Sequence, residues 1–481
     1  MALSLRPQSV GRYRDVARLL VKYGRSDLVR QAELDDLAVT EDAVEPAVPP
    51  KAEELAADLE KLGPTYIKMG QLLSTRADLI PPAYAKALSR LQDAVEPFGF
   101  DEVERIVSAQ LGFRIAKGFA SFESTPLASA SLGQVHRARM RDGREVVVKV
   151  QRPGIRECIA ADMEGLAELA EFADNHFEAG RRYGFSELLR QFRRSLGGEL
   201  DYRREAANLV TLGRILRPYD RLLVPEPIAD YTTSSVLTMQ YVEGRKVTDL
   251  GPLAKLELDG TVLAEQLFQA YLDQILVEGF FHADPHPGNV LLTPDGMLAL
   301  IDVGMVARVP KMMRQLLVKL LLALSDGNGK GVADAAMDMG RPLEWFDAEG
   351  FCAGAAELVE QSQGLCLDQI DAGGVVMELM RISGDNGLRL PPELSMLGKA
   401  LLNLDQVAHT LDPGFNPIEA IEAHTNEVMQ GQMQTSPGSV FSALLEARDF
   451  VEHLPGRVNK VMDTVADGNF ALKVDAFDEA S

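Results

Sequence analysis

Apolar residues in the middle of the chain form short runs separated by turn residues, whereas those on either side recur at helical spacing. Residues 135–138 and 146–150 predict two strands joined about Asp142-Gly143, a dipeptide that favours hairpin turns. Residues 290–292 and 298–301 predict a second pair, joined by the turn residues between them. Further strands are expected at 222–227 and 235–239. Helices are expected within 61–82, from a start at Gly63-Pro64 to an end at Pro81-Pro82, and in most of the chain after residue 302. The other predicted helices are at 10–31, 83–125 with an end at Gly112, 157–198, 199–216, 261–278 and 316–324. The pattern predicts an α+β fold.

Composition limits the class of protein. The 481 residues carry a net charge of −22, which argues against a nucleic-acid-binding protein, because such proteins present a basic surface. Three cysteines, far apart in the sequence, give neither a disulfide framework nor zinc-ligand spacing, and they suit a reducing compartment. We find no secretory signal and no apolar stretch of membrane-spanning length. We therefore expect a cytoplasmic protein without a transmembrane helix, whose contact with a membrane would be peripheral, at its inner face.

Residues 10–31 form a basic amphipathic pattern that has two interpretations. Val10, Val16 and Leu20 recur near helical spacing among arginines. Such a helix can lie on an anionic membrane surface. It can also dock on the protein's own surface with its charges in water. The next segment, 32–59, is acidic and contains prolines, so we expect a linker there.

The stretch 279–305 carries the clearest chemistry. His282, Asp284 and Asn289 precede the second hairpin, and Asp302 follows it. Asp284 could orient or deprotonate a hydroxyl or a water molecule. Asn289 and Asp302 offer oxygen ligands of the kind that Mg²⁺ prefers. The order and spacing match the protein-kinase pattern H-x-D-x-x-x-x-N followed by D-x-G. A polar loop that merely caps a core hairpin is the alternative interpretation.

A loop and a lysine further upstream match the nucleotide-binding part of the kinase pattern. Residues 128–135 have the spacing of the loop G-x-G-x-x-G-x-V with alanine at two glycine positions, so a stiffer loop is expected. Lys149, inside a run of valines, stands where the phosphate-contacting lysine of a kinase belongs. A buried charge needs a partner, and we predict that Glu205 pairs with Lys149. The candidate nucleotide contacts in the loop are Ala128, Ser129, Ala130, Ser131, Gly133 and Val135.

Three more segments offer candidate pocket residues. Tyr241-Val242 lies in a segment with the composition of a hinge between two lobes, and its backbone would contact an adenine ring. Lys68 and Gln71 share one face of the helix predicted over 61–82. Glu199 and Asp201 lie at the start of the next predicted helix, where they could either cap it or face the pocket.

Taken together, these stretches resemble the UbiB family of atypical protein-kinase-like proteins. They match the family's K-x-G-Q helix, its alanine-rich loop, its E-x-D segment, and its catalytic and metal loops. The resemblance covers about residues 60–310 and extends loosely into the helical tail. It rests on PTYIKMGQLLSTRADLIP at 64–81, ASASLGQVH at 128–136, ELDYRREAAN at 199–208, and FFHADPHPGN with IDVG within 280–304.

The resemblance implies a two-lobe protein-kinase-like fold with a helical extension that covers the active site and brings Lys68, Gln71 and Glu199 or Asp201 into the pocket. Val303 replaces the usual Phe of D-F-G, which puts the switching behaviour of such proteins in doubt. The expected segments are a basic helix at 1–31, an acidic linker at 32–59, the K-x-G-Q extension at 60–115, a small lobe with a helical insertion at 116–243, a large lobe with the catalytic loops at 244–345, and a helical tail at 346–481.

The resemblance also implies ligands and roles. The family binds adenine nucleotide with Mg²⁺, here ATP or ADP, and is associated with ubiquinone or other isoprenoid-quinone lipids. Lys149, held by Glu205, would contact the phosphates, and Asn289 and Asp302 would hold Mg²⁺. Asp284 would orient the attacking hydroxyl or water. The expected partners are an isoprenoid-quinone precursor or another lipid, and proteins of quinone biosynthesis.

Three functions are consistent with these residues. The first is an enzyme, an atypical kinase or ATPase, whose phosphoryl acceptor the sequence does not name. The second is a nucleotide-gated scaffold or lipid chaperone, in which the nucleotide sets the position of the helix that carries Lys68. The third is a soluble small-molecule phosphotransferase similar to aminoglycoside or choline kinases, against which the K-x-G-Q helix and the alanine-rich loop weigh.

Overall fold

A computed structural model describes residues 50–425, apart from 77–78, 92–94, 177–183, 252–257, 365–371, 418 and 422–423. The chain divides into two compact units, Met1–Glu422 and Ala423–Ser481, and the first of them holds the structure described below. The basic helix predicted at 10–31 and the last helices of the tail lie outside the described residues.

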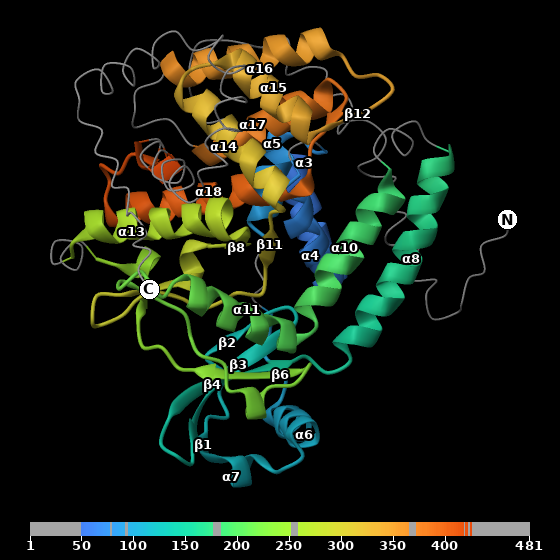
Figure 1. Cartoon of the computed structure of the whole chain (residues 1–481). Helices are drawn as coiled ribbons and strands as arrows, with labels where there is room; N and C mark the ends of the chain where they lie inside the picture. Colours follow the sequence, from blue (N-terminus) through green and yellow to red (C-terminus); the bar gives the residue numbers. More distant parts are fainter. Residues whose placement is uncertain are drawn as a thin grey trace, which may run out of the picture. The chain divides into compact units, whose positions relative to one another are not determined.

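A five-stranded antiparallel sheet forms the smaller, N-terminal lobe (Figure 1). Its strands run in the order β1-β3-β4-β6, and β2 pairs with β3. The hairpin predicted about Asp142-Gly143 is confirmed as β3 and β4. The strands are β1 (Phe119–Phe122), β2 (Ala128–Ser129), β3 (Gly133–Met140), β4 (Glu145–Gln151) and β6 (Val236–Gln240).

The two faces of β4 belong to different cores because successive side chains of a strand point to opposite sides. Val146, Val148 and Val150 pack with helix α6 (Phe100–Leu111) in the small lobe's core. Val147 belongs instead to the large core that continues into the C-terminal lobe. Lys149 lies two residues after Val147 and therefore on the same face of β4. Its side chain points toward the space between the lobes.

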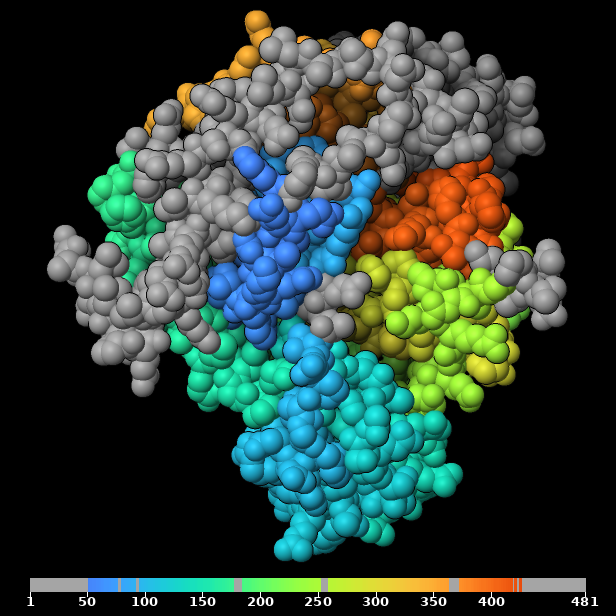
Figure 2. All heavy atoms as spheres, turned by 180° about the vertical axis from the view of Figure 1, so that it is seen from behind, coloured from blue at the N-terminus to red at the C-terminus, as the bar shows by residue number. Residues whose placement is uncertain are grey.

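Three helices near the N-terminus pack on a helical hairpin of the small lobe. Helices α3 (Pro50–Leu62), α4 (Pro64–Leu73) and α5 (Pro82–Ser89) share a hydrophobic cluster with α8 (Ile155–His176) and α10 (Phe185–Glu199). Figure 2 shows the blue extension between the teal helices and the yellow-green C-terminal lobe. Sequence-distant segments therefore meet beside the space between the lobes.

Two helix boundaries in this extension differ from those predicted from the sequence. Residues 50–62 are helical with Ala52, Ala56 and Leu59 buried, so the linker predicted at 32–59 is wrong for residues 50–59. The helix predicted over 61–82 is shorter and ends at Leu73. The hydroxyls of the next two residues donate to carbonyls of the last turn, which ends the helix there.

The stretch predicted as helix over 83–125 also contains elements that the spacing did not indicate. After α6, whose C-cap Gly112 has a φ of 77° as its position at a helix end requires, come the short helix α7 (Ile115–Gly118) and strand β1. Phe119 and Phe122 pack edge-on beneath the sheet, and their burial favours the strand over a longer helix.

The C-terminal lobe places the stretch 279–305 on short strands. Helix α13 (Gly260–Leu272) continues into a π-helical turn, η4 (Asp273–Glu278), before β8 (Phe280–His282). The hairpin predicted at 290–301 is confirmed as β9 (Val290–Leu292) and β10 (Leu298–Leu300). Around it lie β5 (Leu222–Leu223), β7 (Arg245–Lys246), β11 (Val306–Arg308), and the single 3-10 turns η2 (Ala229–Tyr231), η3 (Val247–Asp249) and η5 (Pro287–Asn289).

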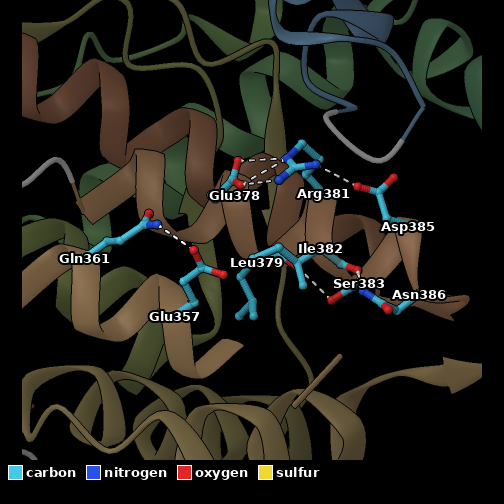
Figure 3. Close-up of polar contacts among 9 residues, drawn as sticks. All are labelled: Glu357, Gln361, Glu378, Leu379, Arg381, Ile382, Ser383, Asp385 and Asn386. Carbon is cyan, nitrogen blue, oxygen red and sulfur yellow. Dashed lines mark hydrogen bonds and ion pairs between the residues drawn. The ribbon is translucent and has the colours of Figure 1, made fainter. Parts of the chain in front are cut away.

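Five helices complete the described part of the chain, and their apolar faces share one core with the stretch 279–305. Figure 3 shows the polar edge of two of them, where Arg381 bonds to Glu378 and Asp385, and Gln361 to Glu357. These bonds lie within single helices and contribute a few tenths of a kcal/mol each, so packing holds the helices together. The helices are α14 (Lys311–Ser325), α15 (Gly329–Met339), α16 (Ala348–Gly364), α17 (Ala372–Asp385) and α18 (Pro392–Leu411), with strands β12 (Arg341–Pro342) and β13 (Leu388–Arg389).

Among the described residues, no helix is long and apolar enough to cross a membrane.

Candidate active site

Lys149 of β4 lies at the centre of a group of charges between the lobes. Its Nζ is 2.9 Å from both carboxylate oxygens of Glu205 and 4.0 Å from Oδ1 of Asp302. Glu205 stands in the first turn of α11 (Tyr202–Ile215) and its side chain is only 6% exposed. The pairing predicted from the sequence is therefore present, and the same lysine reaches the aspartate of the metal loop.

The charges of this group shift one another's pKa values. Burial alone would lower the pKa of Lys149, but the carboxylates of Asp302 and Glu205 outweigh it and hold that pKa well above its ordinary value. Burial raises the pKa of Glu205, against the opposing effect of Lys149. Lys149 lowers the pKa of Asp302. The result is a fixed ammonium beside an ionised aspartate that is 47% exposed and open to a ligand.

Backbone contacts hold the metal loop in place. The amide of Asn208, on α11, donates to the carbonyl of Val303 at 3.2 Å, and Oδ1 of Asp302 accepts from the backbone N–H of Gly304 at 3.0 Å. Val303, which stands where the D-F-G pattern has Phe, is completely buried in the large core. The smaller side chain thus still anchors the loop. The role of Asn208 in holding the metal loop was not predicted.

Asn289, the other candidate metal ligand, lies next to Asp302 across the hairpin. Its backbone carbonyl accepts from Ile301 N–H at 3.1 Å, immediately before Asp302. Within the described ranges no three His, Cys, Asp or Glu side chains gather into a metal site. A carboxylate with an amide oxygen still fits Mg²⁺, because that ion commonly takes one or two protein ligands and completes its shell with water and phosphate oxygens.

Asp284 is held from a helix that the sequence analysis had not connected with it. Lys399 Nζ lies 3.1 Å from Asp284 Oδ1, and Asn403 Nδ2 donates to the same oxygen at 3.1 Å. Both residues stand on α18, more than a hundred positions further along the chain. A lysine and an asparagine four residues apart in an apolar helix carry no sequence signal that points to a particular loop.

The alanine-rich loop is a tight hairpin packed against the extension. Ala130 N–H donates to the Gly133 carbonyl at 2.7 Å, and Ser131 and Leu132 at the tip are buried. Leu132 joins the hydrophobic cluster of α4 and α8. Ser131 and Gly133 are buried, whereas Ala128, Ser129, Ala130 and Val135 are at least partly exposed and leave surface for a nucleotide.

Gly133 is required by close packing. A Cβ at this position would lie 2.5 Å from the Val150 carbonyl oxygen and 2.6 Å from the hydroxyl of Tyr202. Its neighbour in the loop pattern, Val135, lies opposite Lys149 in the β3–β4 ladder. The loop and the lysine are thus fixed to one another by the sheet.

The hinge residues are partly engaged by the sheet. Tyr241 N–H donates to the Glu145 carbonyl at 3.1 Å, and its ring lies 4.3 Å beneath the Arg137 guanidinium. The backbone N–H of Tyr241 therefore already has a hydrogen-bond partner. The groups of this segment that could contact an adenine ring are the Tyr241 carbonyl and the backbone of Val242.

The extension reaches the site through one of its two predicted residues. Lys68 Nζ lies 3.2 Å from Glu199 Oε2, with both side chains largely buried, and the charge of Lys68 lowers the pKa of Asp302 after the larger effect of Lys149. Gln71 does not pair within this charge group; its amide donates to the Leu91 carbonyl at 3.1 Å and ties α4 to the chain after α5.

Glu199 and Asp201 make different contacts in the structure. Asp201 is the N-cap of α11, where its side chain accepts from Arg203 N–H. Glu199 is the last residue of α10 and not part of the first turn of α11, and it pairs with Lys68. A buried hydrogen bond between the extension and the small lobe was not predicted. Thr65 Oγ1 on α4 donates to the carboxylate of Asp162 on α8 at 2.6 Å.

Two lobes with a lysine–glutamate pair, an acid loop and a D-x-G loop between them define a protein-kinase-like fold. The comparisons with known proteins agree. Residues 90–336 match the ABC1 atypical kinase-like domain, and residues 355–416 match the UbiB helical domain. The chain belongs to this family of UbiB-type atypical kinase-like proteins, as the motifs indicated.

Named relatives cover most of the chain. "Probable protein kinase UbiB" of Cellvibrio japonicus is 36% identical over 76% of this chain and 67% of its own length. "ACTIVITY OF BC1 COMPLEX KINASE 7, chloroplastic" of Arabidopsis thaliana is 32% identical over 86% of this chain and 61% of its own length. A solved structure of an erythromycin complex from Mycobacterium tuberculosis is 26% identical and covers 80% of this chain and 98% of that chain, with a TM-score of 0.46.

Proposed function

We propose that this protein binds ATP or ADP with Mg²⁺ and acts as an ATPase or as a kinase for a small acceptor. The observation that supports this most directly is the position of Lys149, 2.9 Å from Glu205 and 4.0 Å from Asp302. Phosphoryl transfer requires little covalent chemistry from the protein and depends on positioned charges. A fixed ammonium beside an exposed, ionised aspartate is such an arrangement.

Each candidate residue has one task in this proposal. Lys149 binds the phosphates and Glu205 fixes its position. Asp302 and Asn289 would hold Mg²⁺, which when bound neutralises charge on the phosphate oxygens. Asp284 orients the attacking hydroxyl or water and accepts its proton. The backbone at Tyr241-Val242 and the exposed part of the alanine-rich loop bind the adenosine.

The acceptor or cargo that we propose is an isoprenoid-quinone precursor or another lipid. Support comes from the resemblance to a family associated with ubiquinone, and from relatives that carry the name UbiB. Proteins of quinone biosynthesis are the corresponding partners. Peripheral contact of the basic segment 10–31 with the inner face of a membrane remains a prediction from the sequence.

A second candidate function, a nucleotide-gated scaffold or lipid chaperone, is favoured by the pair between Lys68 and Glu199. This pair joins the covering helix to the small lobe at 3.2 Å, and the charge of Lys68 acts on Asp302. A ligand that changes the charge at Asp302 would therefore change the electrostatic interactions of Lys68, the residue whose ion pair holds helix α4. Helix α4, with its K-x-G-Q motif, weighs against a simple soluble phosphotransferase.

Nucleotide binding is tested by thermal unfolding with ATP or ADP, each with and without Mg²⁺. A ligand at 100 times its Kd adds about 2.7 kcal/mol to the stability of the folded state. We expect a Mg²⁺-dependent rise in the unfolding temperature that Asp302→Asn abolishes. Asp295→Asn, an exposed aspartate in the turn of the same hairpin, is the matched control and should keep the full shift.

Turnover separates the two candidate functions. Formation of ADP from ATP is measured with and without a phenolic or isoprenoid lipid, on the wild type and on Asp284→Asn. An ATPase releases ADP and phosphate and a kinase releases ADP and the phosphorylated acceptor, and Asp284→Asn keeps nucleotide binding while losing this turnover. Nucleotide binding without ADP formation under any condition supports the scaffold. Retained turnover in Asp284→Asn refutes the role assigned to this residue, and no thermal shift with either nucleotide refutes the proposed nucleotide site.

A further inference from the structure

Two side chains of the helical module contact the carboxylate of Asp284, one through an ion pair and one through a hydrogen bond. Lys399 Nζ and Asn403 Nδ2 both lie 3.1 Å from Oδ1 of Asp284. Asp284 falls within the residues that match the kinase-like domain, whereas Lys399 and Asn403 fall within those that match the helical domain. The contact therefore joins two modules.

The loop that carries Asp284 does not supply these donors itself. Two residues further on, the ring of His286 accepts from Gly288 N–H at 3.0 Å and so caps the turn η5. The ring of His282 lies against its own loop, where Nδ1 accepts from the Asp284 backbone N–H at 3.3 Å. The Nδ1 atoms of both histidines contact backbone groups, and the side chains that contact the Asp284 carboxylate come from α18.

The geometry leaves one carboxylate oxygen for an acceptor. The ion pair with Lys399 and the hydrogen bond from Asn403 both involve Oδ1, and among the described residues no hydrogen bond is made to Oδ2. These two contacts on one oxygen restrict rotation of the carboxylate, so Oδ2 has a defined direction. A candidate base held in this way by further groups is the arrangement that activated hydroxyls require.

Helix α18 is a rigid support for this contact. Leu397, Ala400, Leu401 and Leu404 are buried in the large core, and the helix packs on α13, α17 and η5. Lys399 and Asp284 are themselves partly exposed, at 24% and 29%, so the pair lies at the edge of the site where a ligand can reach it. An ammonium among apolar helix positions is stabilised there by its partner.

We propose that Lys399 and Asn403 are positioning residues that orient Asp284, which makes helix α18 of the helical module a working part of the active site. The acceptor hydroxyl or water binds Oδ2 of Asp284. Its oxygen forms a bond to the γ-phosphorus of ATP while the bond from that phosphorus to the β–γ bridging oxygen breaks, ADP leaves, and the proton of the acceptor passes to Oδ2. This inference rests on the proposed function, because it assigns a task to the same reaction.

The test compares Lys399→Met, Lys399→Arg and Asn403→Ala with the wild type, and uses Gln406→Met, an exposed position on α18, as the matched control. Misplacing a reacting group by about 1 Å can cost about 100-fold in rate. We expect Lys399→Met to lose about that factor in kcat while the Kd for Mg²⁺-nucleotide stays within about twofold. Lys399→Arg keeps a charged donor and should recover at least about tenfold of the loss.

A double-variant comparison shows whether the lysine acts through Asp284. If it does, Asp284→Asn/Lys399→Met has the same residual turnover as Asp284→Asn alone. Additive losses, unchanged turnover in Lys399→Met, or a parallel loss of nucleotide affinity that Arg does not restore would each overturn the inference. A wild type that binds nucleotide but never turns it over refutes the enzyme function instead, before any variant is compared.

Discussion

The pair between Lys149 and Glu205 makes a quantitative prediction about stability. At an effective dielectric constant of about 20, two unit charges separated by the observed 2.9 Å attract by about 6 kcal/mol. The attraction of Lys149 to Asp302 at 4.0 Å is about 4 kcal/mol by the same rule. Loss of Glu205 thus removes one of the two carboxylates that keep the Lys149 ammonium stable in its buried position, and Asp302 remains.

Glu205→Gln should therefore destabilise the protein by about 3 kcal/mol, the low end for a broken buried pair, because Asp302 remains and glutamine keeps a hydrogen-bond acceptor. For a chain of this size that loss lowers the unfolding temperature by about 3 °C. Adding Lys149→Met removes the stranded charge and should restore most of the loss, to within about 1 kcal/mol of the wild type.

Thermal unfolding followed by circular dichroism measures these differences, with Glu226→Gln, an exposed glutamate, as the matched control. The expected signature is non-additive: the double variant is more stable than Glu205→Gln alone. A Glu205→Gln midpoint within about 1 °C of the wild type would refute the reasoning, because the lysine would then not depend on Glu205. So would a double variant less stable than either single one.

Three further predictions concern pH, packing and capping. Burial lowers the pKa of both His136 and His282, so the unfolded chain binds more protons below pH 6.5, and stability should fall on acidification by up to about 2.7 kcal/mol per pH unit. Urea midpoints at about pH 7.5 and 5.5 test this, and His282→Gln should reduce the difference. Gly133→Ala should destabilise by about 2 kcal/mol, since the Cβ meets a backbone oxygen at 2.5 Å, and unchanged thermal unfolding would contradict the packing argument. Asp201→Ala removes an N-cap and should lower the free energy of unfolding in urea by about 1 kcal/mol without changing turnover. If the variant instead lost turnover while its stability stayed that of the wild type, Asp201 would have a role in the pocket.

Contacts that follow from local pattern were predictable from the sequence. The β3–β4 hairpin, the β9–β10 hairpin and the start of α4 at Pro64 follow from turn and capping chemistry. The pairing of Lys149 with Glu205 was predictable for a different reason: a lysine in a valine strand needs an acid, and the motif order limits the choice.

Contacts set by packing between distant segments were not predictable in this way. Lys399 approaches Asp284 because α18 crosses η5 in the large core, a crossing that no local periodicity encodes. Gln71 shares a face with Lys68, yet its partner is the Leu91 carbonyl, because α5 brings the chain back beside α4. Helix α10 ends before Leu200 and α11 begins after Asp201, so Asp201 and not Glu199 is the N-cap of α11.

The charges around the site explain why a divalent cation should be needed for nucleotide binding. Three lysines from three parts of the chain each pair with an acid: Lys68 with Glu199, Lys149 with Glu205 and Lys399 with Asp284, while Asp302 is a further acid beside Lys149. The carboxylates thus outnumber the ammonium groups by one before any phosphate arrives. A nucleotide brings more negative charge and must compete with these acids for their lysines. A Mg²⁺ ion at Asp302 would offset both the excess carboxylate and the charge of the phosphates. Nucleotide affinity should therefore fall steeply when Mg²⁺ is removed.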